Sequence, residues 1–385
     1  MTYNFDEIID RRGTNSLKFD FAKERGRPDN LLPLWVADMD FRAPKEVLDT
    51  LVKCAEHGIF GYTEPKEDYF AALHNWFTRG FGFEVRPEWV VPTPGAVFAL
   101  AAAINALTEP GDGVLIQQPV YYPFFGCIED NRRRIINNPL VYANGSYSID
   151  FDDFETKLRR HKVKLFILCS PHNPVGRVWS AQELARLHEI CLKHGCVVFS
   201  DEIHCDFTFP GNKHVMFGTE NSIICTAPSK TFNLAGLQVA NAFIANAEIR
   251  RKFAKAIDQT GYSQLNTMGL SACQAAYEHG RTWLDQLNAY LLQNLNFVRS
   301  FLENHLSPIK LVEPQGTYLA WLDCTQLGLA QPQLNELITH KARLWLDSGT
   351  MFGSEGTGFQ RVNMACPRAT LEQALMQLKE AVDAA

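Results

Sequence analysis

The sequence lacks the features that mark secreted, membrane-spanning and nucleic-acid-binding proteins. Its 10 cysteines form no C-x-x-C pair and mostly lie in apolar surroundings, as reduced core residues of a cytoplasmic protein do. The longest apolar run, 96–104, is far shorter than the roughly 20 residues that a bilayer-spanning helix needs. Lys and Arg number 37 against 43 Asp and Glu, so no excess of positive charge is available for a nucleic-acid backbone. We therefore expect a cytoplasmic protein without nucleic-acid or membrane partners.

Motifs for metal ions and for nucleotides are also missing. His188 and His194 are six residues apart, which places them about 240° apart around a helix, whereas two zinc ligands on one face need a spacing of four. Gly111 and Gly113 lack the third glycine of a dinucleotide-binding fingerprint, and they precede an apolar run instead of following one. The chain has no Walker A lysine motif. We expect no bound metal ion.

The apolar residues are numerous and regularly arranged. Of the 385 residues, 46% are hydrophobic, which excludes disorder, and a chain of this length and composition is expected to form two domains with a sizeable core. Short apolar runs alternate with helical patterns through the middle of the chain, and this alternation predicts a parallel sheet with crossover helices. The clearest predicted strands are 114–116, 165–169, 197–199 and 223–225. Ser180 and Glu183 form a capping box that opens a predicted helix between the second and third of them.

These patterns predict how the chain is divided. We place a large α/β domain at 46–280 and a smaller α+β domain at 1–45 together with 281–385. The smaller domain combines a helical pattern over 283–304 with strand-like stretches at 317–322 and 360–364. The basic run 132–134 is interpreted as a solvated face without function.

Unusual polar and aromatic residues follow the predicted strands. Ligands of open α/β sheets bind beyond the carboxyl ends of the strands, so these residues are the first candidates for a site. Tyr121 offers an aromatic ring, Asn173 an amide held between two prolines, Asp201 a carboxylate and Lys230 an amine. We expect these four side chains to meet in one crevice.

The run 90–97 adds a fifth element, because Gly95 precedes a helical stretch. A glycine-led helix N-terminus presents free N–H groups and a positive dipole end to an anion such as a phosphate. Pyridoxal 5'-phosphate (PLP) accounts for all five groups. It needs a lysine for a Schiff base, a carboxylate for its pyridine nitrogen, an aromatic face for its ring and a helix N-terminus for its phosphate.

At this point the sequence resembles the fold type I, class I/II aminotransferases and, among them, the PatB/MalY group of cysteine-S-conjugate and cystathionine β-lyases. The resemblance covers almost the whole chain and implies a mostly parallel seven-stranded sheet with flanking helices. Its most specific motifs are PSKTFNLAGL (228–237), PHNPVG (171–176), SDEIH (200–204) and RVN (361–363). LWVADMDF (34–41) favours the lyases over ordinary aminotransferases.

The resemblance implies roles for the residues at the strand ends. Lys230 becomes the Schiff-base lysine and the base that moves the α-proton, and Asp201 pairs with the pyridinium nitrogen. Asn173 donates to the phenolic oxygen of the cofactor, with His204 nearby where many relatives place a tyrosine. Tyr121 stacks on the ring and is, with Lys230, one of the two residues expected to take part in catalysis.

The resemblance also implies the phosphate and substrate contacts. The backbone N–H groups of Ala96 and Val97 and the side chain of Ser229 bind the phosphate, helped by Tyr62 from a second subunit, so the site needs a homodimer. Arg361 grips the substrate α-carboxylate as a bidentate fork. The remaining substrate contacts are Asn173 and Ala37.

Two positions depart from the family pattern, and three residues also have simpler interpretations. Gln238 stands where classical aspartate aminotransferases carry a phosphate-binding arginine, and Ala227 replaces a phosphate-binding serine. His204 is equally well explained as a core histidine or as one that supports a cofactor contact indirectly, while a surface turn for Tyr62 and a structural ion pair for Arg361 are the weaker alternatives.

The implied reaction is β-elimination from L-cystathionine or a related cysteine S-conjugate, which yields a thiol such as homocysteine, pyruvate and ammonia. Such an enzyme would serve methionine biosynthesis. An aminotransferase acting on an amino acid and a 2-keto acid would use the same residues, and only the 34–41 motif separates the two. A third hypothesis is a regulatory or binding protein that contains PLP without needing turnover.

Overall fold

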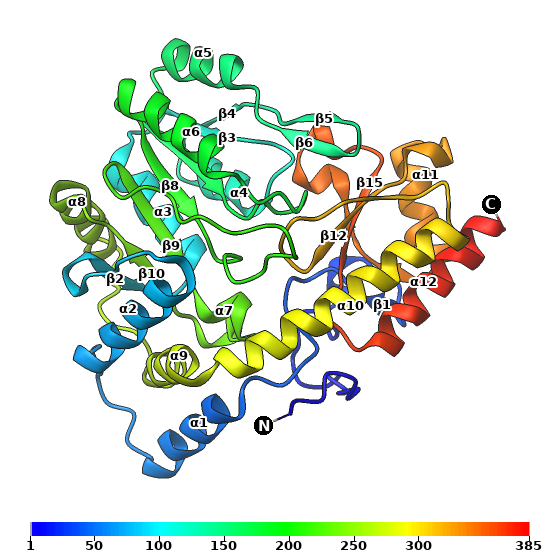
Figure 1. Cartoon of the computed structure of the whole chain (residues 1–385), viewed down its shortest axis with the longest axis horizontal. Helices are drawn as coiled ribbons and strands as arrows, with labels where there is room; N and C mark the ends of the chain where they lie inside the picture. Colours follow the sequence, from blue (N-terminus) through cyan, green and yellow to red (C-terminus); the bar gives the residue numbers. More distant parts are fainter. Residues whose placement is uncertain (1, 385) are drawn as a thin grey trace.

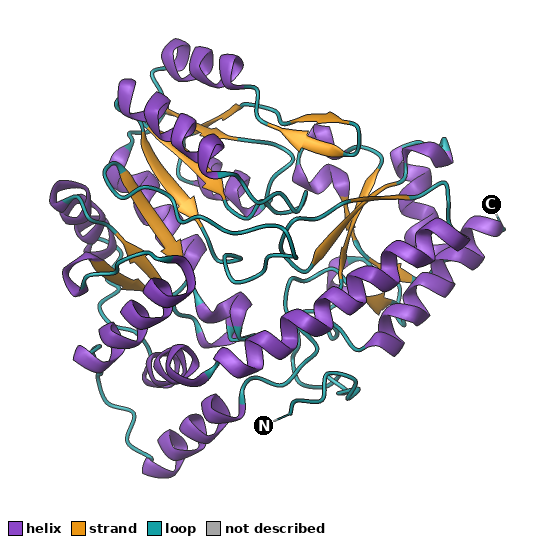
Figure 2. Cartoon of the chain, viewed as in Figure 1, coloured by secondary structure: helices purple, strands orange, loops and turns teal. Residues whose placement is uncertain are grey.

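The computed structural model describes residues 2–384, and its centre is a seven-stranded sheet covered by helices on both faces (Figure 2). The strand order is β2-β10-β9-β8-β7-β3-β4, and the antiparallel pairs are those that β10 makes with β2 and β9. These strands are β2 (Val90–Thr93), β3 (Gly113–Ile116), β4 (Arg134–Asn137), β7 (Leu165–Cys169), β8 (Val197–Asp201), β9 (Ser222–Thr226) and β10 (Ala240–Phe243). The predicted mostly parallel sheet is confirmed.

Alternate residues of the buried strands enter two separate hydrophobic cores. On one face Phe166 and Val198 pack with helices that include α5 and α6, and on the other Ile167 and Phe199 pack with α3, α4 and α8. The helices of the first face are α2 (Glu67–Phe81), α5 (Phe151–His161), α6 (Ala181–Lys193) and α9 (Thr267–His279). Those of the second face are α3 (Ala96–Leu107), α4 (Pro123–Asp130) and α8 (Ala247–Asp258).

A second, antiparallel sheet lies beside the first, and the long helix α10 (Arg281–His305) runs between the two parts of the molecule (Figure 1). This sheet has the order β11-β12-β15-β14. Its strands are β11 (Lys310–Val312), β12 (Leu319–Asp323), β14 (Asp347–Ser348) and β15 (Phe359–Asn363). Its core includes residues of α10, α11 (Gln331–Glu336) and α12 (Arg368–Asp383).

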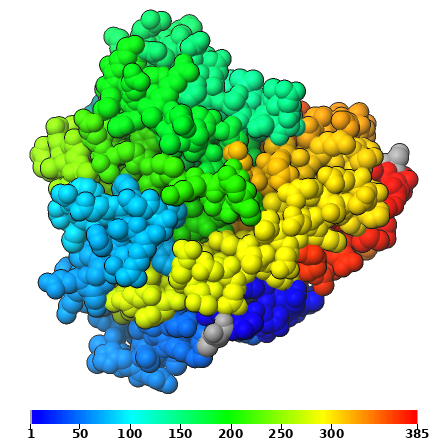
Figure 3. All heavy atoms as spheres, in the orientation of Figure 1, coloured from blue at the N-terminus to red at the C-terminus, as the bar shows by residue number. Residues whose placement is uncertain are grey.

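The N-terminal segment joins both parts. β1 (Leu32–Pro33) pairs in parallel with β13 (Leu344–Trp345), and α1 (Lys45–His57) packs on α9. Figure 3 shows the start of the chain lying against the first turns of α10, where Tyr290 Oη donates to Asp6 Oδ1 at 2.5 Å. The remaining elements are the short helix α7 (Pro228–Thr231) and the hairpin of β5 (Val141–Ala143) and β6 (Ser146–Ser148).

The structure confirms the predicted strands and extends three of the four. β8 runs two residues further than predicted, because Asp201 still pairs with Cys169 and Cys225, so Asp201 ends the strand instead of following it. The stretch predicted to begin at 317 becomes a strand only at Leu319, because Thr317 has a left-handed φ of 67°. The capping box of Ser180 and Glu183 is present as predicted.

The basic run 132–134 is only in part the solvated face that the sequence suggested, because its middle residue is buried. Arg133 is buried, and its guanidinium donates to Thr108 Oγ1 at 2.9 Å and Asn105 Oδ1 at 3.1 Å at the end of α3. A buried guanidinium with these partners satisfies carbonyl and hydroxyl groups that the helix end leaves free. Arg132 and Arg134 are exposed.

Two further observations bear on the sequence expectations. Within residues 2–384, no helix is both long and apolar enough to cross a membrane. All the cysteines are free, and all but Cys54 are buried. The division into domains at 46–280 and at 1–45 with 281–385 stays a prediction.

Candidate active site

Lys230 lies in α7, directly beyond the carboxyl end of β9. Its Nζ donates a hydrogen bond of 2.7 Å to the carbonyl oxygen of Ala37, a residue 193 positions earlier in the chain. Burial lowers the pKa of the Lys230 amine to about 8, and the nearby Asp38 carboxylate opposes that shift. This amine therefore loses its proton more easily than an ordinary lysine, which favours its action as a nucleophile or base.

Asp201 ends β8, and it is 4% exposed. Its Oδ1 accepts a long hydrogen bond of 3.4 Å from the Ile203 N–H. Burial raises the pKa of the carboxyl to about 7, although the positive charge of Lys230 acts in the opposite direction. A buried carboxyl of this kind is stabilised as an anion when a cationic group is placed beside it.

Arg361 and Asn173, which the sequence analysis assigned to substrate binding, contact each other directly. Arg361 Nη1 donates to Asn173 Oδ1 at 3.0 Å, and Nη2 donates to the Trp35 carbonyl at 2.7 Å. Arg361 is 2% exposed and forms an ion pair with Asp347 of the neighbouring strand β14. Sequence reasoning missed Asp347, although an arginine alternating with apolar residues in a buried strand predicts a carboxylate partner.

Tyr121 and His204 are two further predicted site residues. The hydroxyl of Tyr121 has a pKa raised by burial, and its ring packs edge-on against Phe124 at 5.6 Å between centroids. His204 is buried, and burial followed by the charges of Lys230 and Arg361 lowers its pKa well below the usual range. Its ring is therefore neutral, and its Nδ1 has no partner among the residues that the structure describes.

The predicted phosphate site lies at the start of α3. Gly95 precedes the first helical residue, and no side chain caps this helix N-terminus, so the backbone N–H groups of Ala96 and Val97 are open to an anion. Ser229 is half-buried at the start of α7. Gln238 is exposed at the end of a short turn.

Tyr62 differs from the other predicted site residues in its exposure. It is 94% exposed, so it makes almost no contact within its own chain. Ile59 and Phe60 beside it are also exposed, at 69% and 60%. An aromatic and aliphatic segment exposed in this way is typical of a surface that another protein chain covers.

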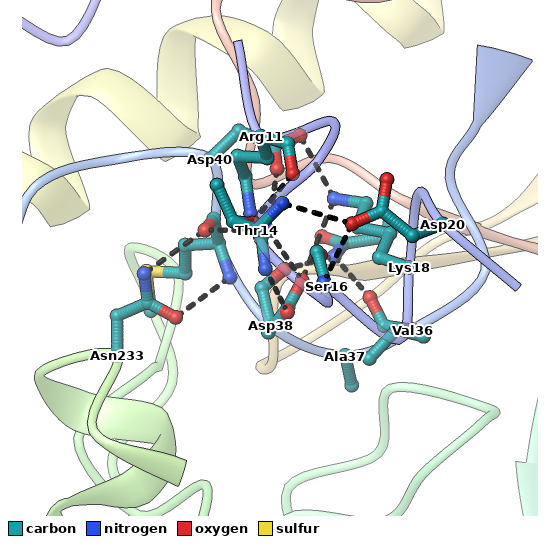
Figure 4. A network of polar contacts seen from close by, with 12 residues as sticks. Arg11, Thr14, Ser16, Lys18, Asp20, Val36, Ala37, Asp38, Asp40 and Asn233 are labelled. Carbon is teal, nitrogen blue, oxygen red and sulfur yellow. Dashed lines mark hydrogen bonds and ion pairs between the residues drawn. The ribbon is translucent and has the colours of Figure 1, made fainter. Parts of the chain in front are cut away.

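The segment 34–41, called the strap below, is held by side chains from both parts of the molecule. Asn363 Nδ2 donates to the carbonyl oxygens of Val36 at 2.7 Å and Asp38 at 2.6 Å. Asn233, three residues after Lys230, accepts from one strap N–H and donates to two strap carbonyls at 2.9 and 3.0 Å (Figure 4). The sequence analysis identified the motifs that contain Asn233 and Asn363. It did not predict their contacts with the strap, because these contacts join residues that are far apart in the sequence.

The arrangement fits PLP, the cofactor that the sequence indicated. The Asp201 carboxyl is buried without a strong cationic partner, and the Nδ1 of His204 lacks a hydrogen bond. The uncapped start of α3 offers N–H groups, and Lys230 offers an amine of lowered pKa. These residues would hold the pyridine nitrogen, a polar substituent, the phosphate and the aldehyde carbon of PLP, respectively.

Comparisons with known proteins agree with this assignment. A family model described as aminotransferase class I and II matches residues 30–378. Cystathionine beta-lyase PatB of Bacillus subtilis is 43% identical to this chain, covering 98% of this chain and 100% of PatB. Protein MalY of Escherichia coli is 32% identical, with 99% of each chain covered.

A solved structure extends the similarity to the whole fold. Cystalysin from Treponema denticola, whose crystal structure contains a pyridoxal 5'-phosphate cofactor, has a TM-score of 0.96 and 37% sequence identity. The similarity covers 100% of both chains. The chain therefore belongs to the class I and II aminotransferase family of fold type I, in the group that contains PatB and MalY.

Proposed function

We propose that this protein is a PLP-dependent carbon–sulfur β-lyase that cleaves L-cystathionine or a related cysteine S-conjugate. The supporting relatives include PatB, a cystathionine β-lyase that matches this chain over its full length. The observation that carries the proposal is the placement of Lys230 and Arg361. Both donate to the same short stretch of backbone, Lys230 to the Ala37 carbonyl and Arg361 to the Trp35 carbonyl, so a base and a carboxylate-binding group are held close together.

PLP, when bound, supplies an electron sink that stabilises negative charge at the α-carbon of an amino acid. Arg361 orients the substrate by its α-carboxylate, and Lys230 takes the proton from the α-carbon. The electron pair of that C–H bond then expels the β-sulfur as a thiolate. Water converts the remaining three-carbon enamine to pyruvate and ammonia.

Three other side chains support these steps. Asp201 would keep a proton on the pyridine nitrogen of bound PLP, and Tyr121 would stack on its ring. Burial holds the pKa of Tyr121 above its usual range, so its hydroxyl remains protonated and is a candidate donor to the leaving thiolate, as are Lys230 and Tyr62. Asn173 and Ala37 are proposed to complete the contacts to substrate.

An aminotransferase is the second candidate, because the matching family model carries that description and the same residues would serve it. A regulatory or binding protein that contains PLP is the third. The intact set of Lys230, Asp201, Asn173 and Arg361 favours turnover over a role in binding alone.

The proposed function is tested by mixing the PLP-loaded protein with L-cystathionine in the absence of any keto acid. We expect pyruvate and free thiol in equal amounts, measured with lactate dehydrogenase and a thiol reagent. If no pyruvate forms but an added 2-keto acid is converted to its amino acid, the protein is an aminotransferase. If neither occurs while PLP stays bound, the binding role replaces both.

We further propose a homodimer with shared active sites. The support is the segment that contains Ile59, Phe60 and Tyr62, whose exposed apolar side chains would be covered by the second subunit. Tyr62 would then reach the phosphate of the partner's cofactor.

Shared sites predict complementation between two inactive variants. Tyr62→Ala and Lys230→Ala, co-expressed with different affinity tags, form mixed dimers in which one of the two sites contains both native residues. Random assembly should restore about a quarter of the wild-type activity, since half of the dimers are mixed and half of their sites are intact. If Tyr62 serves its own chain, the mixture stays inactive.

A cytoplasmic location and a role in methionine biosynthesis complete the proposal. The ten free cysteines suit a reducing compartment. Release of homocysteine from cystathionine would supply the thiol that becomes methionine after methylation.

A further inference from the structure

Tyr318 lies beside Lys230 but belongs to a different part of the chain. It directly precedes β12, and it is completely buried. Its ring packs edge-on against Phe207 at 4.9 Å and against His204 at 5.6 Å between centroids. These contacts fix the ring plane, and with it the direction in which the hydroxyl points.

The Tyr318 hydroxyl binds the same atom as the Lys230 amine. Tyr318 Oη donates to the Ala37 carbonyl at 2.9 Å, and Lys230 Nζ donates to that oxygen at 2.7 Å. A carbonyl oxygen has two lone pairs, so both donors are accommodated at once. Burial raises the pKa of Tyr318 far above its usual range, which keeps the hydroxyl protonated as a donor.

The strap that carries Ala37 is anchored by ion pairs just after this residue, at Asp38 and Asp40. Arg11 pairs with Asp38 at 2.6 Å and with Asp40 at 2.8 Å, and Lys18, which is 0% exposed, pairs with Asp40 at 2.8 Å (Figure 4). Four charges arranged in this way neutralise one another and prevent the strap from shifting along its length. The direction in which the Ala37 carbonyl points then depends on the groups that donate hydrogen bonds to its oxygen.

We propose that Tyr318 is a positioning residue that fixes the Ala37 carbonyl, and that this carbonyl holds the Lys230 amine in place for proton transfer. The inference rests on the proposed function for its catalytic consequence. An amine that is released from the cofactor has four rotatable side-chain bonds and needs an acceptor to keep it at the α-carbon. The Ala37 oxygen is that acceptor. The hydrogen bond from Tyr318 holds this oxygen in place when the amine moves.

The test compares Tyr318→Phe with the wild-type holoenzyme. We expect kcat to fall about 10- to 50-fold, with KM changed less than about twofold. Displacing the base by a fraction of an ångström slows proton transfer but leaves the contacts that bind the substrate intact. Tyr69→Phe is the matched control. Tyr69 is also buried and donates to Asn241 Oδ1 at 2.7 Å, but it has no hydrogen bond to the strap or to Lys230. The kcat of Tyr69→Phe should therefore stay within about twofold of the wild-type value.

A double-variant experiment separates positioning from a merely structural role. In Lys230→Ala, added ethylamine replaces the lysine as a base that is not tethered to the chain. Adding Tyr318→Phe to this variant should leave the ethylamine-rescued rate unchanged, because no lysine remains to be positioned. If Tyr318→Phe lowers the rescued rate as much as it lowers the native rate, Tyr318 does not act through Lys230, and the inference is overturned.

A substrate-free measurement distinguishes this inference from the proposed function. When PLP is added to the cofactor-free chain, absorbance follows the covalent capture of its aldehyde by Lys230. We expect Tyr318→Phe to slow this capture about tenfold. A normal capture rate contradicts the positioning role even if the lyase reaction itself is confirmed, and slowed capture supports it even if the preferred amino-acid substrate proves different.

Discussion

Replacing Lys230 with alanine should reduce pyruvate release from L-cystathionine by at least about a thousandfold, because the base that moves the α-proton is lost. The protein should remain folded, since removing an amine of lowered pKa from a buried position also removes an unfavourable buried charge. The measurement is the initial rate at saturating substrate, together with the absorbance of bound PLP. The covalent form of the cofactor should disappear while PLP still binds non-covalently.

The control for this variant is Lys164→Ala. Lys164 is half-exposed and pairs with Asp112 on the surface, so its loss should change the rate less than about twofold. Full turnover by Lys230→Ala would refute the proposed chemistry. Restoration of part of the rate by small amines would instead show that the missing group is an amine, as expected.

Replacing Asp201 with asparagine should have the second-largest effect. The amide keeps the shape of the side chain, but it cannot hold a proton on the pyridine nitrogen, so the electron sink is weakened. We expect kcat to fall about 100- to 10,000-fold, measured as pyruvate release with PLP in excess. Because burial raises the pKa of Asp201 to about 7, the neutral amide should not lower the melting temperature of the cofactor-free chain.

The neighbouring residue Glu202 provides a contrasting control. Its carboxylate is fully buried and accepts hydrogen bonds from Ser200 Oγ at 2.7 Å and from the Phe217 N–H at 3.0 Å, besides pairing with His214 at 2.7 Å. Glu202→Gln should therefore lower the melting temperature with little change in kcat. If both variants lose activity equally, the effect of Asp201→Asn reflects general damage to the end of β8, and the assigned role is wrong.

The positions of the site residues along the sheet could be predicted from the sequence. Apolar runs identify β7, β8 and β9, and the carboxyl ends of neighbouring parallel strands must lie at one edge, so Asn173, Asp201 and Lys230 converge. Gly95 before an apolar helical run likewise predicts the open helix N-terminus of α3. These inferences need only local periodicity and a rule of topology.

The partners of Arg361 could not be predicted in the same way. The motif RVN identified the arginine, but its contacts to Asp347 and to the Trp35 carbonyl join residues 14 and 326 positions away. The antiparallel pairing of β14 with β15 brings the first of these together, and the strap brings the second. No spacing within the sequence predicts either of these two contacts.

The sequence by itself determined the fold class, the family and the identity of the groups expected to bind PLP, because strand and helix periodicity and short motifs are properties of neighbouring residues. Only the tertiary structure decided that the strap accepts hydrogen bonds from both Lys230 and Arg361, that Tyr318 shares the Ala37 carbonyl with the lysine, and that Tyr62 is almost fully exposed. These arrangements depend on the packing of distant segments, where hydrogen-bond geometry and burial, not local propensity, select one conformation.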